Sequence, residues 1–208
     1  MILAEDYGVY SYDRPGWGAN GEDPVGLAGN ARHLAELIES FSQGPPVLVG
    51  YSYGAAVVLE YLRMSQLPGV SALLVAPAAN AGAVGPLDRI LEMEWLAGVL
   101  SLATSRGGHR LAKLPLNSGF RRVRSLLTES RGLAGELRNA SGYQLKSASL
   151  GIVAGLADRV VPPSAVAALA ADVDAAFVAW TPRAGHLIVW QEPKAIKAAL
   201  DRLCAISG

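Results

Sequence analysis

Short apolar runs alternate with stretches of helical periodicity along most of the chain. The apolar runs are rich in β-branched and aromatic residues and end near Gly, Pro or Asp, which is typical of strands. Five strands are predicted on this basis: Tyr7–Tyr12, Val47–Tyr51, Val70–Ala76, Leu150–Gly155 and Asp174–Trp180. The run at Val47–Tyr51 is apolar throughout, as expected of a strand buried on both faces of a parallel sheet.

Segments with apolar residues at helical spacing separate these strands. Four helices are predicted, at about Val25–Phe41, Ala55–Met64, Pro162–Ala171 and Pro193–Leu203. Ahead of the first helix, Asp23-Pro24 offers an N-cap followed by a first-turn proline. Strands that alternate with helices are joined by right-handed crossovers, so the pattern predicts an α/β fold, a mostly parallel sheet with flanking helices.

The stretch from 78 to 146 breaks this alternation, because it is mostly helical in period. We therefore expect a core made of residues 1–77 and 147–208, with residues 78–146 inserted between two strands as a helical lid. From Asn80 to Lys146 the chain carries ten Lys and Arg against five Asp and Glu. This excess fits a lid that attracts an acidic substrate or an anionic surface, and it also fits a solvated helix face, the commoner reason for such charge.

The composition narrows the functional classes. The 208 residues have a formal net charge of zero, which gives no sign of nucleic acid or an anionic membrane as partner. No uninterrupted apolar run reaches the roughly 18 residues of a transmembrane helix, and Met1–Tyr10 lacks the features of a signal peptide. The single cysteine, Cys204, cannot form an internal disulfide, so a reducing compartment is the simpler interpretation and a cytoplasmic location is expected. The sequence has no metal-ligand spacing and no nucleotide-binding motif, so we expect neither a metal nor another cofactor.

The strongest local signal is Gly50-Tyr51-Ser52-Tyr53-Gly54, a G-x-S-x-G motif. It follows a predicted strand and opens a predicted helix, the context in which this motif presents a serine nucleophile on a strained turn. The two glycines are expected because side chains at those positions would meet neighbouring backbone. The N–H of Tyr53, at the helix start, is then a candidate oxyanion donor. A chance match in a chain with 23 glycines is the alternative, and the flanking strand and helix argue against it.

A serine hydroxyl needs a base that accepts its proton. His186 follows the last predicted strand, on a loop that can reach the carboxyl edge of the sheet, where open α/β sheets place their sites. His33 lies in a predicted surface helix and His109 in the predicted lid, so neither has this position. Asp158 follows an earlier strand and precedes a proline-initiated helix, where it can orient the imidazole, although an ordinary turn aspartate is the alternative. The order Ser52, Asp158, His186 therefore predicts a nucleophile, an acid and a base.

These motifs resemble the α/β-hydrolase superfamily. The resembling segments are YDRPGWG (Tyr12–Gly18), GYSYGA (Gly50–Ala55), GLADRVVPP (Gly155–Pro163) and AGHL (Ala184–Leu187). The resemblance implies a lid-bearing serine hydrolase that cleaves a small ester or similar acyl substrate through an acyl-enzyme. The superfamily also contains lactonases, C–C bond hydrolases and haloperoxidase-like enzymes, so the substrate stays open. A serine at position 52 argues against dehalogenases and epoxide hydrolases, which usually carry aspartate there.

The chain departs from this superfamily at its front. Members normally have three further strands before the one predicted at Tyr7–Tyr12, and a loop with an HG-type motif after the third gives the second oxyanion donor. Without the third strand, a gap of about 10 Å, two strand spacings, would open between Tyr7–Tyr12 and Val47–Tyr51. Either the chain is a truncated form of a longer product, which we expect, or Tyr7–Tyr12 shifts into the vacant place, or another chain fills it. With one oxyanion donor missing, we expect the chain as given to be a weak enzyme.

The remaining predictions concern the substrate pocket and the alternative class of function. Asp13 and Arg14 are expected to fix their own loop, and the candidate pocket residues are Trp17, Tyr51 and Trp95. The apolar character of the candidate pocket favours a small apolar or aromatic ester. A non-catalytic module of the same fold, used for binding, is the alternative. The missing oxyanion segment favours that module, and the three intact site residues disfavour it.

Overall fold

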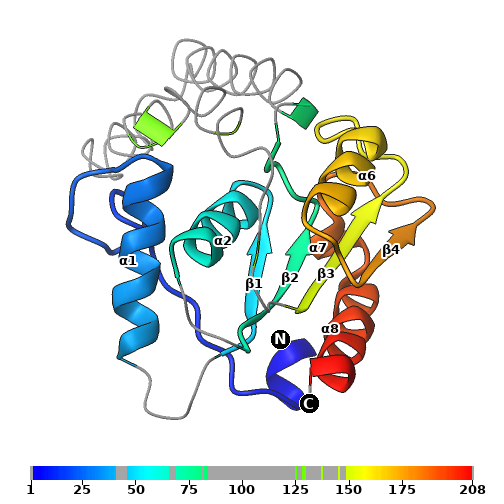
Figure 1. Cartoon of the computed structure of the whole chain (residues 1–208), viewed down its shortest axis with the longest axis horizontal. Coiled ribbons are helices and arrows are strands. Elements are labelled where there is room, and N and C mark those ends of the chain that lie inside the picture. The colour runs from blue at the N-terminus through cyan, green and yellow to red at the C-terminus, as the bar shows by residue number, and fades with distance from the viewer. Residues whose placement is uncertain are drawn as a thin grey trace, which may run out of the picture.

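The computed structural model describes residues 2–40, 46–65, 69–80, 82–83, 125, 128–129, 137, 145 and 149–207. Within these residues, four strands form one parallel sheet in the order β1 (Leu48–Tyr51), β2 (Ser71–Val75), β3 (Ser149–Gly155) and β4 (Phe177–Thr181) (Figure 1). Each strand pairs with the next one along the chain, so all of them end at the same edge of the sheet. This arrangement confirms the predicted α/β fold.

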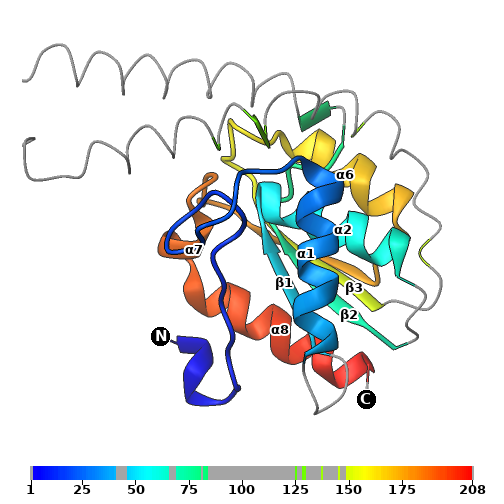
Figure 2. The same cartoon turned by 90° about the vertical axis from the view of Figure 1, so that its left-hand side faces the viewer.

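Helices cover both faces of the sheet. On one face lie α2 (Tyr53–Met64) and α6 (Pro163–Asp172), with α1 (Leu27–Glu39) packed on the outside of α2. On the other face lie α8 (Pro193–Ser207) and the short 3-10 helix η1 (Ile2–Glu5) (Figure 1, Figure 2). Successive strand residues point to opposite faces, so Leu74 and Ile152 join the first layer while Leu73 and Val153 join the second. Covered faces explain why β2 and β3 are apolar after their first residue, a serine in each.

The helices bury the stripes that the sequence pattern predicts. In α1 the buried apolar residues are Leu27, Ala31, Leu34 and Ile38, spaced three or four positions apart. Helix α2 lies between α1 and the sheet, and it is accordingly buried from Ala55 to Leu62. Helix α6 begins at Pro163, a first-turn position where the missing N–H of proline costs nothing.

The strand prediction for Tyr7–Tyr12 is wrong. These residues form no strand and run outside the sheet as a mostly exposed segment (Figure 2). The segment carries one aliphatic side chain, Val9, and a strand is stable only where its backbone finds a neighbouring strand. Side chains hold its ends instead: the Tyr7 hydroxyl bonds Asp201 of α8, and the Tyr12 ring lies beside His33 of α1. The segment therefore does not shift into the place beside β1, the edge strand of the described sheet.

The other predicted elements are confirmed, with ends that differ by up to four residues. Two short elements were not predicted, η1 and the helix α7 (Ile188–Gln191). Each has four residues, which is too few to show a helical pattern of apolar positions. The predicted insertion at 78–146 lies largely outside the described residues and stays a prediction. Among the described residues, no helix combines the length and the apolar character that crossing a membrane requires.

Candidate active site

Ser52 sits on the turn that joins β1 to α2, in a strained conformation with φ 52° and ψ −119°. Such backbone costs of order 1–3 kcal/mol for a residue with a side chain and persists only where its surroundings enforce it. Here the Ser52 N–H donates to the carbonyl of Val75 on β2 (2.9 Å), and the Ser52 carbonyl accepts from the N–H of Ala78 (3.2 Å). Strand β2 and the loop that follows it thus hold both backbone polar groups of Ser52.

Gly50 and Gly54, the two glycines of the motif, differ in whether a side chain would fit. A Cβ at Gly50 would lie 2.7 Å from the Ala55 Cα and 2.7 Å from the Gly54 carbonyl oxygen, so no other residue fits without moving backbone. A Cβ at Gly54 would meet nothing within 4 Å. The expectation that both positions exclude side chains is right for Gly50 and wrong for Gly54, because the space beside Gly54 is open.

Three side chains from separate loops form one hydrogen-bonded chain at the carboxyl edge of the sheet. His186 Nε2 lies 2.9 Å from Ser52 Oγ, and His186 Nδ1 lies 2.9 Å from Asp158 Oδ2. A carboxylate can only accept, so Nδ1 carries the proton and Nε2 is left to accept from the serine hydroxyl. The structure therefore brings together the three residues that the sequence analysis selected.

The Asp158 side chain is fixed by backbone contacts that do not involve His186. Its side chain is 1% exposed, and its Oδ1 accepts from the N–H groups of Val160 (2.8 Å) and Val161 (2.9 Å). Those two bonds leave Oδ2 to face His186. Backbone donors that fix one carboxylate oxygen orient the other one without loss of entropy at the moment of reaction.

The loops that carry Asp158 and His186 are hydrogen-bonded to each other. The Ala157 N–H donates to the Ala184 carbonyl (3.1 Å), and Gly155 permits this approach because a Cβ there would lie 2.0 Å from the Ala184 oxygen. The Gly185 N–H donates to Gln191 of α7 (2.9 Å), which closes the histidine loop on itself. Backbone contacts therefore help to set the spacing between Asp158 and His186.

Tyr51 contacts the histidine from the other side. Its hydroxyl donates to the His186 carbonyl (3.0 Å), and the two rings lie 5.5 Å apart between centroids. The Trp190 ring of α7 meets the Tyr51 ring edge-on at 6.2 Å. These contacts place Tyr51, a predicted pocket residue, against the loop that carries His186.

The other predicted site residues are placed as follows. Tyr53 is the first residue of α2, whose N-terminal N–H groups point toward the turn at Ser52. The Trp17 indole N–H donates to Glu129 (3.0 Å), so this side chain belongs to a polar network. Trp95 lies outside the described residues. The pocket roles of Trp17, Tyr51 and Trp95 stay predictions.

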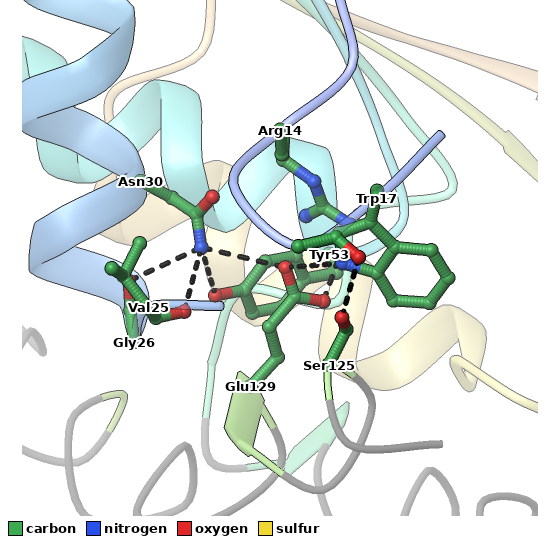
Figure 3. A network of polar contacts seen from close by, with 9 residues as sticks. Arg14, Trp17, Val25, Gly26, Asn30, Tyr53, Ser125 and Glu129 are labelled. Atoms are coloured by element: carbon green, nitrogen blue, oxygen red, sulfur yellow. Dashed lines mark hydrogen bonds and ion pairs between the residues drawn. The ribbon is translucent and has the colours of Figure 1, made fainter. Parts of the chain in front are cut away.

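A buried polar network lies on the other side of Tyr53 and was not predicted (Figure 3). Glu129 accepts from Arg14 (3.2 Å), from Trp17 and from Asn30 (3.4 Å), and it is 6% exposed. Burial raises the pKa of the Glu129 carboxyl above its ordinary value, although Arg14, Trp17 and Asn30 each pull it down. The sequence offered a sign that Asn30 is buried, since it is a polar residue among the apolar positions of the α1 stripe. It offered no such sign for Glu129.

This network also adds a distant partner to the loop at Asp13–Gly18. Asp13 does fix its own loop, because its carboxylate accepts from the Ala19 N–H (2.8 Å). The Arg14 guanidinium carbon lies 5.6 Å from the centroid of the Trp17 ring in the same loop, and the guanidinium also pairs with Glu129, 115 residues further along the chain. The spacing of residues in a sequence window carries no information about such a partner.

A parallel sheet with a serine on a strained strand-to-helix turn, followed by an acid and a base on later post-strand loops, defines the α/β-hydrolase architecture. The chain belongs to the alpha/beta hydrolase family, whose model matches residues 2–199. The match covers nearly the whole sequence and confirms the resemblance that the four motif segments indicated. No curated protein matches the chain.

Solved structures of similar fold include hydrolases from several bacteria. A thermophilic esterase from Thermogutta terrifontis is 21% identical, with a TM-score of 0.65 over 94% of this chain and 78% of that one. A hydrolase from Pseudomonas aeruginosa is 20% identical, with a TM-score of 0.59 over 93% and 78%. An alpha/beta hydrolase fold protein from Burkholderia ambifaria is 19% identical, with a TM-score of 0.65 over 91% and 78%. Similarity at this level of identity establishes the fold and leaves the substrate open.

Proposed function

We propose that this chain is a serine hydrolase that cleaves a small carboxylic ester, or a similar acyl substrate, through an acyl-enzyme on Ser52. The observation that carries the proposal is the continuous hydrogen-bonded chain from Ser52 Oγ through His186 to Asp158, with both links at 2.9 Å. This is the arrangement in which a base can take the serine proton while a carboxylate holds the base. The esterase from Thermogutta terrifontis, similar in fold, supports ester bonds as the substrate class.

The first half-reaction forms the acyl-enzyme. Ser52 Oγ attacks the acyl carbonyl carbon as its proton moves to His186 Nε2, and the carbonyl electron pair moves onto oxygen. Asp158 stabilises the imidazolium that results. The tetrahedral intermediate then collapses, the bond to the leaving alcohol breaks, and His186 returns the proton to that alcohol.

The second half-reaction repeats these steps with water. A water molecule attacks the acyl carbon while His186 accepts its proton, and collapse releases the carboxylic acid and restores the Ser52 hydroxyl. The N-terminus of α2 carries partial positive charge, and the Tyr53 N–H at that end is the proposed donor to the oxyanion. A donor aimed at the oxygen stabilises the charge that both transition states develop.

A fluorophosphonate probe tests the proposal directly. We expect one equivalent of covalent label on the folded chain by intact mass, and turnover of p-nitrophenyl acetate or butyrate. Both should vanish in Ser52→Ala, while Ser40→Ala, at an exposed serine of the α1 cap, should behave like the original chain. If the folded chain takes no label and its turnover equals that of Ser52→Ala, the fold serves as a non-catalytic binding module instead.

A further inference from the structure

We propose that Glu129 is a positioning residue that acts through Tyr53, the residue next to the nucleophile. The inference rests on the proposed serine hydrolase function and extends it to a side chain 77 positions beyond Ser52. The contacts shown for Glu129 are with Arg14, Trp17 and Asn30. Its effect would pass through two neighbours that it shares with Tyr53, Arg14 and Asn30.

The first route runs through Arg14. Glu129 Oε2 accepts from Arg14 Nη2 at 3.2 Å, and the Arg14 guanidinium carbon lies 4.7 Å from the centroid of the Tyr53 ring. A guanidinium over an aromatic face is attracted by the ring quadrupole. The carboxylate thus determines where the cation rests, and the cation covers one face of the Tyr53 ring.

The second route runs through Asn30. Its Nδ2 lies 3.4 Å from Glu129 Oε1 and 3.2 Å from the Tyr53 hydroxyl oxygen, and the same nitrogen also donates to the carbonyls of Val25 and Gly26 (Figure 3). Asn30 is fully buried. The Asn30 amide therefore connects the Glu129 carboxylate to the hydroxyl end of Tyr53, while the Arg14 guanidinium lies over the face of the Tyr53 ring.

The segment that carries Glu129 is itself seated on the loop at Asp13–Gly18. Ser125, four residues before Glu129, donates its hydroxyl to the Gly16 carbonyl at 2.7 Å. Gly16 has φ +84°, and a Cβ there would lie 2.6 Å from the Ser125 oxygen. Ser125 and Glu129 thus both bond to the same loop, Ser125 at Gly16 and Glu129 at Arg14 and Trp17.

Stability alone does not account for a carboxylate at this place. Ionised carboxylates are almost never buried unless they are paired, and burial outweighs the partners in setting the pKa of Glu129, which is raised. The ionised group therefore adds little to the stability of the fold. A glutamine of the same shape should fold as well, yet it cannot hold the guanidinium by charge.

The consequence for chemistry follows from the place of Tyr53. Its N–H belongs to the first residue of α2, and the donor position must be accurate to a fraction of an ångström to serve the oxyanion. A ring held on its face and at its hydroxyl restrains the backbone to which it is attached. If the contacts that restrain Tyr53 are lost, the transition state, in which the oxyanion exists, should lose more stabilisation than the bound substrate does.

A double-mutant cycle tests the proposal on the full chain. Glu129→Gln is expected to lower kcat for p-nitrophenyl butyrate about three- to tenfold with KM changed less than about twofold. In a Tyr53→Leu background, the same change should leave kcat within about 1.5-fold. Glu39→Gln, an exposed glutamate on α1, is the matched control and should leave kcat unchanged. If Tyr53→Leu does not fold, Tyr53→Phe removes the hydroxyl route and should roughly halve the logarithm of the Glu129 effect.

Equal losses from Glu129→Gln in the original chain and in the Tyr53→Leu background would overturn the proposal, because Glu129 would then act elsewhere. A rise in KM without loss of kcat would overturn it as well. The ring signals of labelled Tyr53 in an NMR spectrum separate this failure from failure of the proposed function. If the original chain shows no turnover and no fluorophosphonate label, the hydrolase proposal fails, and a shift of those signals in Glu129→Gln still decides whether Glu129 positions Tyr53.

Discussion

At the scale of single residues, Asp158 shows how the local backbone orients a buried carboxylate. Two backbone N–H groups occupy one of its oxygens, and the other oxygen meets the imidazole. The carboxylate is therefore fully bonded although it is buried. Its geometry depends on the loop that precedes α6 and does not depend on a bound substrate.

Asp158→Asn should lower kcat for ester hydrolysis by about 10⁴-fold, the loss seen where such a substitution has been measured in a triad. The asparagine oxygen can still accept from Val160 and Val161, so its NH₂ group would face His186 Nδ1. The imidazole must then carry its proton on Nε2, where it cannot accept from Ser52. Steady-state kinetics with circular dichroism as the folding control measures this, and a loss below tenfold in a folded variant would contradict the assigned role.

Tyr51→Phe should have a smaller effect of the same kind. The change deletes the hydroxyl that donates to the His186 carbonyl and keeps the ring that packs against His186 and Trp190. A hydrogen bond of this type is worth about 0.5–1.5 kcal/mol, so kcat should fall about two- to tenfold. Unchanged kcat together with a raised KM would instead assign Tyr51 to the substrate pocket, as the sequence analysis predicts.

At the scale of elements, the turn between β1 and α2 makes different demands on Gly50 and Gly54, although both are glycines of the same motif. Gly50→Ala should lower the free energy of unfolding by about 1–3 kcal/mol, because its Cβ would lie 2.7 Å from backbone atoms of the following helix. Gly54→Ala is the matched control, since the space beside Gly54 is open and the residue lies in α2. We expect it to be neutral or to stabilise by up to about 1 kcal/mol.

Urea unfolding followed by circular dichroism measures both variants. Equal stability of Gly50→Ala and Gly54→Ala would show that the close approach at Gly50 is relieved by a small backbone shift. Turnover should follow the same order, because a displaced turn moves Ser52 Oγ away from His186.

Elements also show where the sequence pattern is sufficient and where it is not. The strands from β1 to β4 and the helices α1, α2, α6 and α8 were predictable, because a covered face imposes an apolar pattern that a short window reveals. The segment Tyr7–Tyr12 has strand-like composition and is not a strand. A strand needs a partner, and no window of sequence states whether one is present.

At the scale of the whole molecule, the buried Glu129 should make stability depend on pH. Its folded pKa is raised above the ordinary value of 4.5, so the folded state retains the Glu129 proton at pH values where the unfolded chain has lost it. The contribution of Glu129 to stability is therefore full below about pH 4.5 and is lost as the pH rises through the raised pKa. Relative to Glu129→Gln, the original chain should become less stable as the pH rises from 4.5 toward 7.

Chemical unfolding of both proteins at a series of pH values measures this difference, and Glu39→Gln again serves as the control. The comparison cancels every titrating group that the two proteins share. A difference that stays constant, or that grows in favour of the original chain as the pH rises, would mean that the ion pair with Arg14 outweighs the cost of burial.

The sequence by itself determined the succession of strands and helices, the family and the residue types of the site, because apolar periodicity and turn chemistry are local and short windows encode them. Only the tertiary structure decided which distant groups meet. Ser52 and His186 are 134 positions apart and within hydrogen-bonding distance, and Arg14 finds Glu129 across 115 positions. Such contacts, like the exclusion of Tyr7–Tyr12 from the sheet, follow from how whole layers pack, since burial and pairing are settled between elements and not within them.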